Sequence, residues 1–175
     1  MHQIAVLVDV RSAPYSRYTP HFNRGRLREE VVAAGLKYGY LGEELGGRPE
    51  CEEFYDSAGH VLYGRLASSP LFLEGIGRLE RGADTHRIAV MCSEEDPSGC
   101  HRHLLIGRVL AERGIAMYHI RGDGRLQSEA ELEEAAKHRR GEDLQPTLWE
   151  DAEVRVWKSI RSVSPKNQHR SSSER

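Results

Sequence analysis

Arg87-Ile-Ala-Val-Met-Cys92 is a short apolar run that leads into the polar segment Ser93-Glu-Glu-Asp-Pro-Ser-Gly-Cys-His-Arg102. Such a run is typical of a buried strand, and the apolar periodicity after residue 102 predicts a helix. A strand that leads through a polar loop into a helix is characteristic of open α/β sheets, which bind ligands at the carboxyl ends of their strands. Residues 92–102 also gather two thiols, three carboxylates, an imidazole and a guanidinium. This stretch therefore predicts both the fold class and the place where chemistry occurs.

Other apolar runs alternate with helical patterns along the chain. We expect further strands over 4–8, 36–40 and 115–120, and helices that begin near Asn23, Ser69, Asp96 and Ser128. Residues 42–66 are rich in glycine and polar residues, which predicts a long loop with a short helix. The alternation predicts a single α/β domain with a largely parallel sheet flanked by helices.

The 175 residues are enough for one such domain and a tail. We expect the α/β domain over 1–140, an extension over 141–163 that either packs or offers a partner surface, and a disordered tail over 164–175. The tail is polar and rich in serine, so it cannot bury enough apolar surface to fold alone.

The overall charge favours no particular partner. The formal net charge of −2 gives no general attraction to nucleic acid or membranes, and no apolar run approaches the ~20 residues of a membrane span. The first residues lead into a strand and not into a signal peptide. Three cysteines are an odd number and form no disulfide framework. We therefore expect a cytoplasmic protein without a membrane partner, whose oligomeric state the sequence leaves open.

Charged side chains follow each predicted strand. Because the carboxyl ends of parallel strands meet at one edge, these groups are expected to converge there. They lie in Asp9-Val-Arg11 with nearby Arg17, in Glu43-Glu-Leu-Gly-Gly-Arg48, in Cys92-Ser-Glu94 and in His119-Ile-Arg121-Gly-Asp123.

Arginines at this edge predict an anion site. The candidate donors are the free N–H groups of the helix that opens at Pro97 and the guanidinium groups of Arg11, Arg17, Arg48 and Arg102. Such groups bind phosphate or carboxylate. Alternatively, some of these arginines pair with Asp9, Glu94 or Asp96 and only hold the loops.

Three kinds of chemistry are open at the same edge. Cys92 or Cys100, near a helix start and arginines, could be a nucleophile with a lowered pKa, although cysteines are often simply buried. Asp9, Glu94 and Asp96 could supply acid–base chemistry or belong to an ordinary ion-pair network. Cys92, Cys100 and His101, with His119 or His103 as a further ligand, could bind zinc. No Cys-x-x-Cys pair is present and adjacent Cys and His residues cannot easily share one ion, so we predict no metal.

Aromatic residues add one further possibility. Tyr15, Tyr18, Phe22, Tyr55 and Tyr63 alternate with arginines in the predicted loops. This pattern suits stacking on a planar ligand such as a nucleobase, and it is also common in packed loops.

Several blocks carry a family resemblance: Leu7-Val-Asp-Val-Arg-Ser12, Pro20-His-Phe-Asn23, Leu45-Gly-Gly-Arg48, Met91-Cys-Ser-Glu-Glu-Asp-Pro97, Cys100-His-Arg102, His119-Ile120 and Asp123-Gly124. They occur over about residues 4–136 in the order of the bacterial family called domain of unknown function 488, which this chain resembles. The resemblance implies a single cytoplasmic α/β domain and no particular reaction. It points to Asp9, Arg11, Phe22, Gly46, Gly47, Cys92, Glu94, Cys100, His101 and Arg102 as the shared positions.

One departure from the resembled family concerns the start of the chain. Family members usually begin with a further strand, a Thr-Ile-Gly-His-Ser-like turn and a helix, whereas this chain begins at the next strand. We expect the missing turn to remove a glycine and a histidine from the same edge.

Together these observations predict an enzyme of hydrolase or group-transfer type that binds an anionic, phosphate- or nucleobase-containing ligand. Its predicted catalytic residues are Glu94, Asp9 and Cys92, of which Cys92 is expected to shape the loop more than to attack. Its predicted ligand-binding residues are Arg11, Arg17, Phe22, Gly46, Gly47, Arg48, Cys100, His101, Arg102 and His119. A non-enzymatic nucleotide or nucleic-acid binding module and a zinc or thiol redox site are the alternatives, and the sequence leaves the cofactor open.

Overall fold

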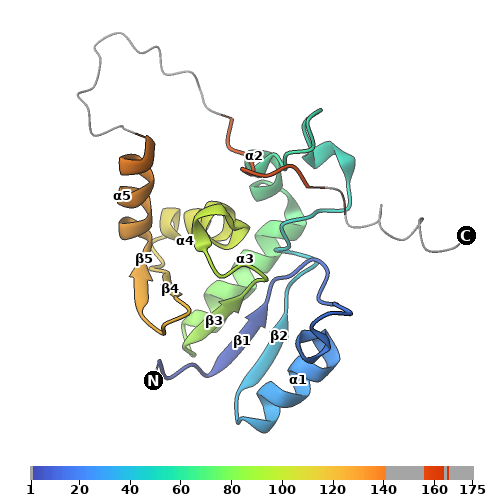
Figure 1. The fold of residues 1–175 in the computed structure, drawn as a ribbon, viewed down its shortest axis with the longest axis vertical. Helices are drawn as coiled ribbons and strands as arrows, with labels where there is room; N and C mark the ends of the chain where they lie inside the picture. The colour runs from blue at the N-terminus through green and yellow to red at the C-terminus, as the bar shows by residue number, and fades with distance from the viewer. Residues whose placement is uncertain (1, 141–155, 164, 166–175) are drawn as a thin grey trace, which may run out of the picture.

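A computed structural model describes residues 2–140, 156–163 and 165 (Figure 1). The strands are β1 (Val6–Asp9), β2 (Lys37–Tyr40), β3 (Ile88–Met91), β4 (Tyr118–Ile120) and β5 (Leu126–Ser128). The α-helices are α1 (Arg24–Ala33), α2 (Tyr63–Ala67), α3 (Pro70–Ala83), α4 (Arg108–Glu112) and α5 (Glu129–Arg140). Shorter helical segments are η1 (Pro20–Phe22), η2 (Glu52–Phe54), η3 (Pro97–Gly99) and the π-helical η4 (Arg102–Gly107). Within this described part, no helix is long and apolar enough to cross a membrane.

Three parallel strands form the central sheet in the order β2-β1-β3. Val8 of β1 aligns with Gly39 on one side and with Val90 on the other. Helices flank this sheet, with α1 next to β2 and α3 along β3 (Figure 1). The predicted α/β fold with a largely parallel sheet is confirmed.

Helix α3 supplies much of the core. Ser69 caps it by accepting a hydrogen bond from the Phe72 N–H, and Pro70 fits the first helical position, where no N–H is needed. Phe72 and Ile76 are fully buried in one cluster with residues of β1 and α4. The three- and four-residue spacing of Phe72, Ile76 and Leu79 places them on one helix face, as the sequence pattern predicted.

The segment expected as a fourth parallel strand behaves differently. β4 pairs antiparallel with β5, and the two form a hairpin outside the three-stranded sheet. The turn closes through the hydrogen bond from the Gly124 N–H to the Arg121 carbonyl, and Gly124 has a φ of 82° that favours glycine. Closing this short loop costs little conformational entropy, because few residues are ordered. β4 therefore pairs with its close neighbour β5 and not with β3, which is more distant in the sequence.

The helix expected to open at Pro97 is broken into three parts. Asp96 caps η3 by accepting a hydrogen bond from the Ser98 N–H, and the chain turns at Cys100 before η4 and α4 continue. This interruption sets the directions of the side chains of residues 100–103.

Residues 156–163 lie against the loop and helix around α2. The Ser159 N–H donates to the Val61 carbonyl, and the Trp157 ring N–H donates to the Leu104 carbonyl at 2.8 Å. The rest of the predicted extension, 141–155, lies outside the described residues, as does the predicted disordered tail apart from residue 165.

Replacing Phe72 with Ala should lower the free energy of unfolding by about 3–5 kcal/mol, because it leaves a cavity in a closed core. Urea denaturation measures the loss. The matched control is Leu71→Ala on the same helix, since Leu71 is 52% exposed and its removal should change stability by less than about 0.5 kcal/mol. Equal losses in both variants would contradict this assignment of the core face.

Candidate active site

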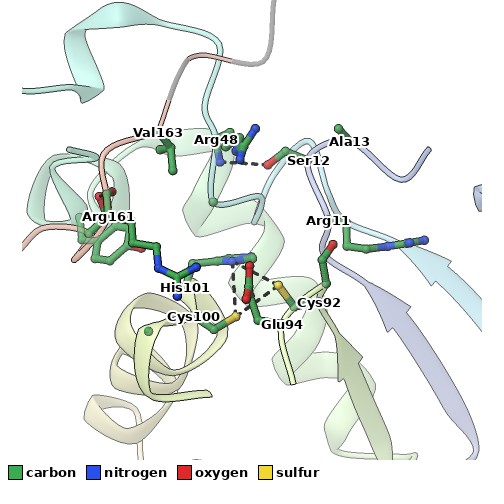
Figure 2. A pocket seen from close by; sticks show the side chains of 15 residues that line it. Arg11, Ser12, Ala13, Arg48, Cys92, Glu94, Cys100, His101, Arg161 and Val163 are labelled. Atoms are coloured by element: carbon green, nitrogen blue, oxygen red, sulfur yellow. Dashed lines mark hydrogen bonds between the residues drawn. The ribbon is translucent and has the colours of Figure 1, made fainter. Parts of the chain in front are cut away.

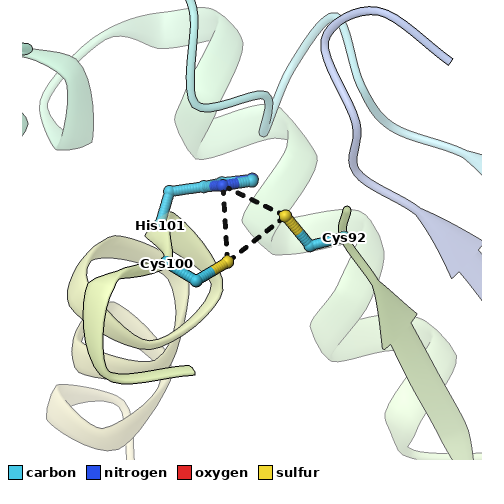
Figure 3. Close-up of side chains that lie close together, drawn as sticks. All are labelled: Cys92, Cys100 and His101. Atoms are coloured by element: carbon cyan, nitrogen blue, oxygen red, sulfur yellow. Dashed lines mark hydrogen bonds between the residues drawn. The ribbon is translucent and has the colours of Figure 1, made fainter. Parts of the chain in front are cut away.

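Three side chains meet at the carboxyl end of β3. The Cys100 thiol donates to Cys92 Sγ across 3.2 Å, and His101 Nδ1 lies 3.6 Å from Cys92 Sγ and 3.9 Å from Cys100 Sγ (Figure 3). We call these three residues the thiol–imidazole cluster. Cys100 is buried, while Cys92 and His101 are half-buried.

Local geometry brings this cluster together. Cys92 directly follows β3, and the turn of η3 returns the chain so that Cys100 faces it. Gly47 lies behind the imidazole, where a Cβ would stand only 2.8 Å from His101 Cγ. A larger residue at position 47 would displace the ring, so this glycine shapes the site through its lack of a side chain.

The hydrogen bonds of the cluster favour a thiolate at Cys92. The Cys100 thiol makes the largest contribution, and together with His101 and the Glu94 backbone N–H it lowers the pKa of Cys92 to about 3, against the opposing effect of burial. The same contact raises the pKa of Cys100, which keeps its proton and acts as the donor. The pair therefore has one reactive sulfur and one supporting thiol.

A cavity of about 270 Å³ opens beside the cluster (Figure 2). Seven of the predicted site residues line it: Arg11, Gly47, Arg48, Cys92, Glu94, Cys100 and His101. The edge of the parallel sheet thus carries a cavity with the Cys92 sulfur in its wall, at the place where this fold class binds ligands.

Two arginines give this cavity its positive charge. Arg48 follows the loop after β2, and Arg161 comes from the segment at 156–163. Neither guanidinium forms an ion pair with another described residue, so both are free to bind an anion that enters. Glu94 lines the same cavity and is exposed.

Comparison with known proteins identifies the family. The family described as Domain of unknown function DUF488 matches residues 1–109. The chain belongs to this family. The matched region contains the whole thiol–imidazole cluster, whereas Arg161 lies beyond it. Searches of curated proteins and of solved structures found no match.

In this DUF488 chain, Asp9 and Arg11 form a buried ion pair next to the cavity. Arg11 donates from Nε and Nη2 to the two Asp9 oxygens, at 2.8 and 2.7 Å, and Tyr38 donates to Asp9 as well. Burial raises the pKa of Asp9, but the bonds from Arg11 and Tyr38 outweigh it and hold this pKa below its ordinary value. Figure 2 shows the Arg11 side chain pointing away from Cys92 and His101. Asp9 therefore holds Arg11 in position, and Asp9 itself does not line the cavity.

The structure places five other predicted ligand-binding residues outside this cavity. Arg17 contacts the Tyr18 ring on an exposed loop, and the Phe22 carbonyl accepts a hydrogen bond from Arg11. Arg102 donates to the Glu95 carbonyl, and His119 bonds Glu129. The fifth, Gly46, packs against Ser12, where a Cβ would lie 2.3 Å from the Ser12 hydroxyl oxygen.

Sequence reasoning missed four polar residues of the cavity wall: Ser12, Ser93, Ser159 and Arg161. Ser12 and Ser93 could have been included because they directly follow Arg11 and Cys92. The other two come from 156–163, and no periodicity or motif indicates that this segment returns to the edge of the sheet.

The thiol–imidazole cluster also has the composition of a zinc site. Its three ligand atoms lie within 4.8 Å of one another. The sequence suggested that the adjacent residues Cys100 and His101 could not easily bind one ion. In the structure both side chains turn toward Cys92, so their adjacency does not prevent them from sharing a metal. Three soft ligands beside a cavity fit Zn²⁺ with an open fourth position.

Removal of the Cys100 thiol should raise the pKa of Cys92, because the thiolate loses its largest hydrogen-bond contribution. Ultraviolet thiolate absorbance measured against pH, in a Cys51→Ser background, follows this change. Cys100→Ala should move the midpoint upward toward the ~8.5 of an ordinary thiol, and Cys100→Ser, which keeps an O–H donor, should move it less. Identical midpoints in the two variants would exclude the thiol–thiolate bond.

Proposed function

We propose that this protein is an enzyme that uses the Cys92 thiolate as the nucleophile for hydrolysis or group transfer on a small anionic substrate. The observation that carries the proposal is the presence of this sulfur in the wall of a cavity that also holds two unpaired arginines. A thiolate attacks more readily than a thiol, and fixed cations hold and orient a phosphate or carboxylate beside it.

The reaction would proceed in two steps. Cys92 Sγ attacks the phosphorus or acyl carbon of the substrate, a bond to sulfur forms, and the bond to the leaving oxygen breaks while a solvent water protonates that oxygen. In the second step water or another acceptor attacks the sulfur-bound group, Glu94 takes the proton of that acceptor, and the thiolate of Cys92 leaves. Every proton and bond is accounted for without a redox partner.

The remaining residues of the site support these steps. Cys100 and His101 stabilise the thiolate before attack and after its release. Arg48 and Arg161 neutralise negative charge on the substrate, and the buried Tyr63 closes part of the cavity wall. A reducing compartment such as the cytoplasm would keep both sulfurs free.

A pair of alkylating reagents tests the nucleophile and the anion site without knowledge of the substrate. Iodoacetate is an anion, whereas iodoacetamide is a neutral reagent of similar size. In a Cys51→Ser background, Cys92 should react with iodoacetate about tenfold faster, relative to iodoacetamide, than a free small thiol does, because the arginines attract the anion. Rates come from mass spectrometry of the intact protein.

Replacing both Arg48 and Arg161 with Gln should remove this preference, and inorganic phosphate should slow alkylation of the unaltered site. Arg17→Gln is the matched control, since Arg17 is exposed and lies outside the cavity. The proposal fails if Cys92 is inert to both reagents, or if the preference for iodoacetate persists without the two cavity arginines.

A second candidate function is the binding of single-stranded nucleic acid by the loop before α1. Tyr15 and Tyr18 are 76% and 78% exposed, and Arg17 stacks on the Tyr18 ring. Exposed rings next to a cation are the elements on which unpaired bases stack. These residues are separate from the cavity, so the two functions can be tested independently.

If this second function holds, Tyr15→Ala with Tyr18→Ala should weaken binding of a fluorescent oligothymidylate by about 1–3 kcal/mol for each stacked base. Cys92→Ser should leave this binding unchanged. Fluorescence anisotropy at low salt measures both. Absence of binding by the unaltered protein would eliminate this candidate.

A further inference from the structure

A second group of chemically active side chains lies away from the thiol–imidazole cluster. His103 of η4, His119 of β4 and Glu129 of α5 bring two imidazoles and one carboxylate together. We propose that these three residues form a binding site for a divalent transition-metal cation such as Zn²⁺, Co²⁺ or Fe²⁺. The inference is independent of the function proposed for Cys92.

The ligand atoms already converge on one point. His119 Nε2 lies 2.7 Å from Glu129 Oε1, and His103 Nδ1 is hydrogen-bonded to Glu129 Oε2. All three donor atoms lie within 4.8 Å of one another. The two imidazoles stand at 86° to each other with their centres 5.9 Å apart, so their nitrogens reach the carboxylate from different directions. A cation could replace the protons between these atoms after small side-chain rotations.

These three side chains are largely buried, which is unusual for a group that contains a carboxylate. The side chains of His119, His103 and Glu129 are only 1%, 13% and 17% exposed. A carboxylate in such a place requires compensation, and a bound cation supplies it. Two imidazoles and one carboxylate are a ligand set that suits zinc and iron better than calcium or magnesium.

The backbone around the group leaves space for it. At Gly107 a Cβ would lie 2.3 Å from Glu129 Oε1, so the carboxylate can approach η4 only because this residue is glycine. The π-helical turn that carries His103 is a type of irregularity often found at functional sites. Ser128 and Glu131 form a capping box that fixes the start of α5, directly beside Glu129.

The site has an open side. A cavity of about 650 Å³ is lined by His103 and Glu129, with Glu133 one helical turn further along α5. Three protein ligands with room for water or a substrate are the arrangement of catalytic metal sites, whereas structural sites are closed by a fourth protein ligand. Gly99 and Arg161 line both this cavity and the cavity of Cys92, so the two sites are neighbours.

The absorption spectrum of bound Co²⁺ can distinguish this site from the thiol–imidazole cluster. Bound Co²⁺ absorbs visible light, and thiolate ligands add a charge-transfer band that imidazole and carboxylate ligands do not give. Full-length protein with Cys51, Cys92 and Cys100 replaced by Ser should bind one equivalent of Co²⁺ and show the visible bands without the thiolate band. Isothermal titration calorimetry gives the stoichiometry and affinity.

Variants assign the ligands. His103→Asn and Glu129→Gln should each weaken Co²⁺ binding about tenfold or more, since loss of an outer-shell partner alone commonly has that effect. His21→Asn is the matched control and should bind as the parent does, because His21 is exposed on η1, far along the chain from the site. Glu129→Gln retains a hydrogen-bond acceptor, and His103 lies at the cavity wall, so at least one variant should keep its far-ultraviolet circular dichroism.

Two results would overturn the proposal. One is a folded, cysteine-free protein that shows no visible cobalt bands. The other is cobalt binding that His103→Asn and Glu129→Gln leave unchanged, which would mean that the group only fastens α5 and the β4–β5 hairpin to the core. If the cysteine-free protein does not fold, the unaltered protein decides the question through a second equivalent of Co²⁺ that adds visible bands without additional thiolate absorption.

Discussion

The buried ion pair between Asp9 and Arg11 is the contact on which the binding edge depends. Asp9 is fully buried at the end of the central strand, and such a charge is tolerated only with a partner and hydrogen bonds. Arg11 satisfies both carboxylate oxygens and also bonds the Phe22 carbonyl, while Tyr38 reaches Asp9 from β2. Loss of one partner from a pair of this kind destabilises a protein by about 3–5 kcal/mol. The pair therefore joins β1, β2 and the loop before α1, and leaves the opposite side of that loop free for the cavity.

A second constraint is the close approach of two sulfurs. The turn through η3 places Cys100 against Cys92, and one proton serves the pair. This asymmetry, with one thiolate and one supporting thiol, explains why two cysteines in the same buried place have opposite pKa shifts. The same proximity makes the cluster suitable for zinc, so thiol chemistry and metal binding are competing uses of one geometry.

Irregular backbone recurs where polar groups gather in this protein. The interrupted helix from Pro97 to Glu112 contributes Cys100 and His101 to one site and His103 to another, on different sides of the chain. Glycines at 47 and 107 make the corresponding space, one beside an imidazole and the other beside a carboxylate.

The α/β class, the core face of α3 and the position of the cysteine-containing loop at a strand end could all be predicted from the sequence. They follow from local periodicity, from capping residues and from the shared direction of parallel strands, which can be recognised in short segments of the chain. The sequence did not predict that β4 leaves the sheet, that Arg11 turns toward Asp9, or that Arg161 enters the cavity. Nor did it predict that His119 contacts Glu129 and lies outside the cavity beside Cys92. These outcomes depend on contacts between segments distant in sequence. Several charged residues look alike in their local sequence, and only burial and hydrogen bonding in the folded chain select which of them become partners.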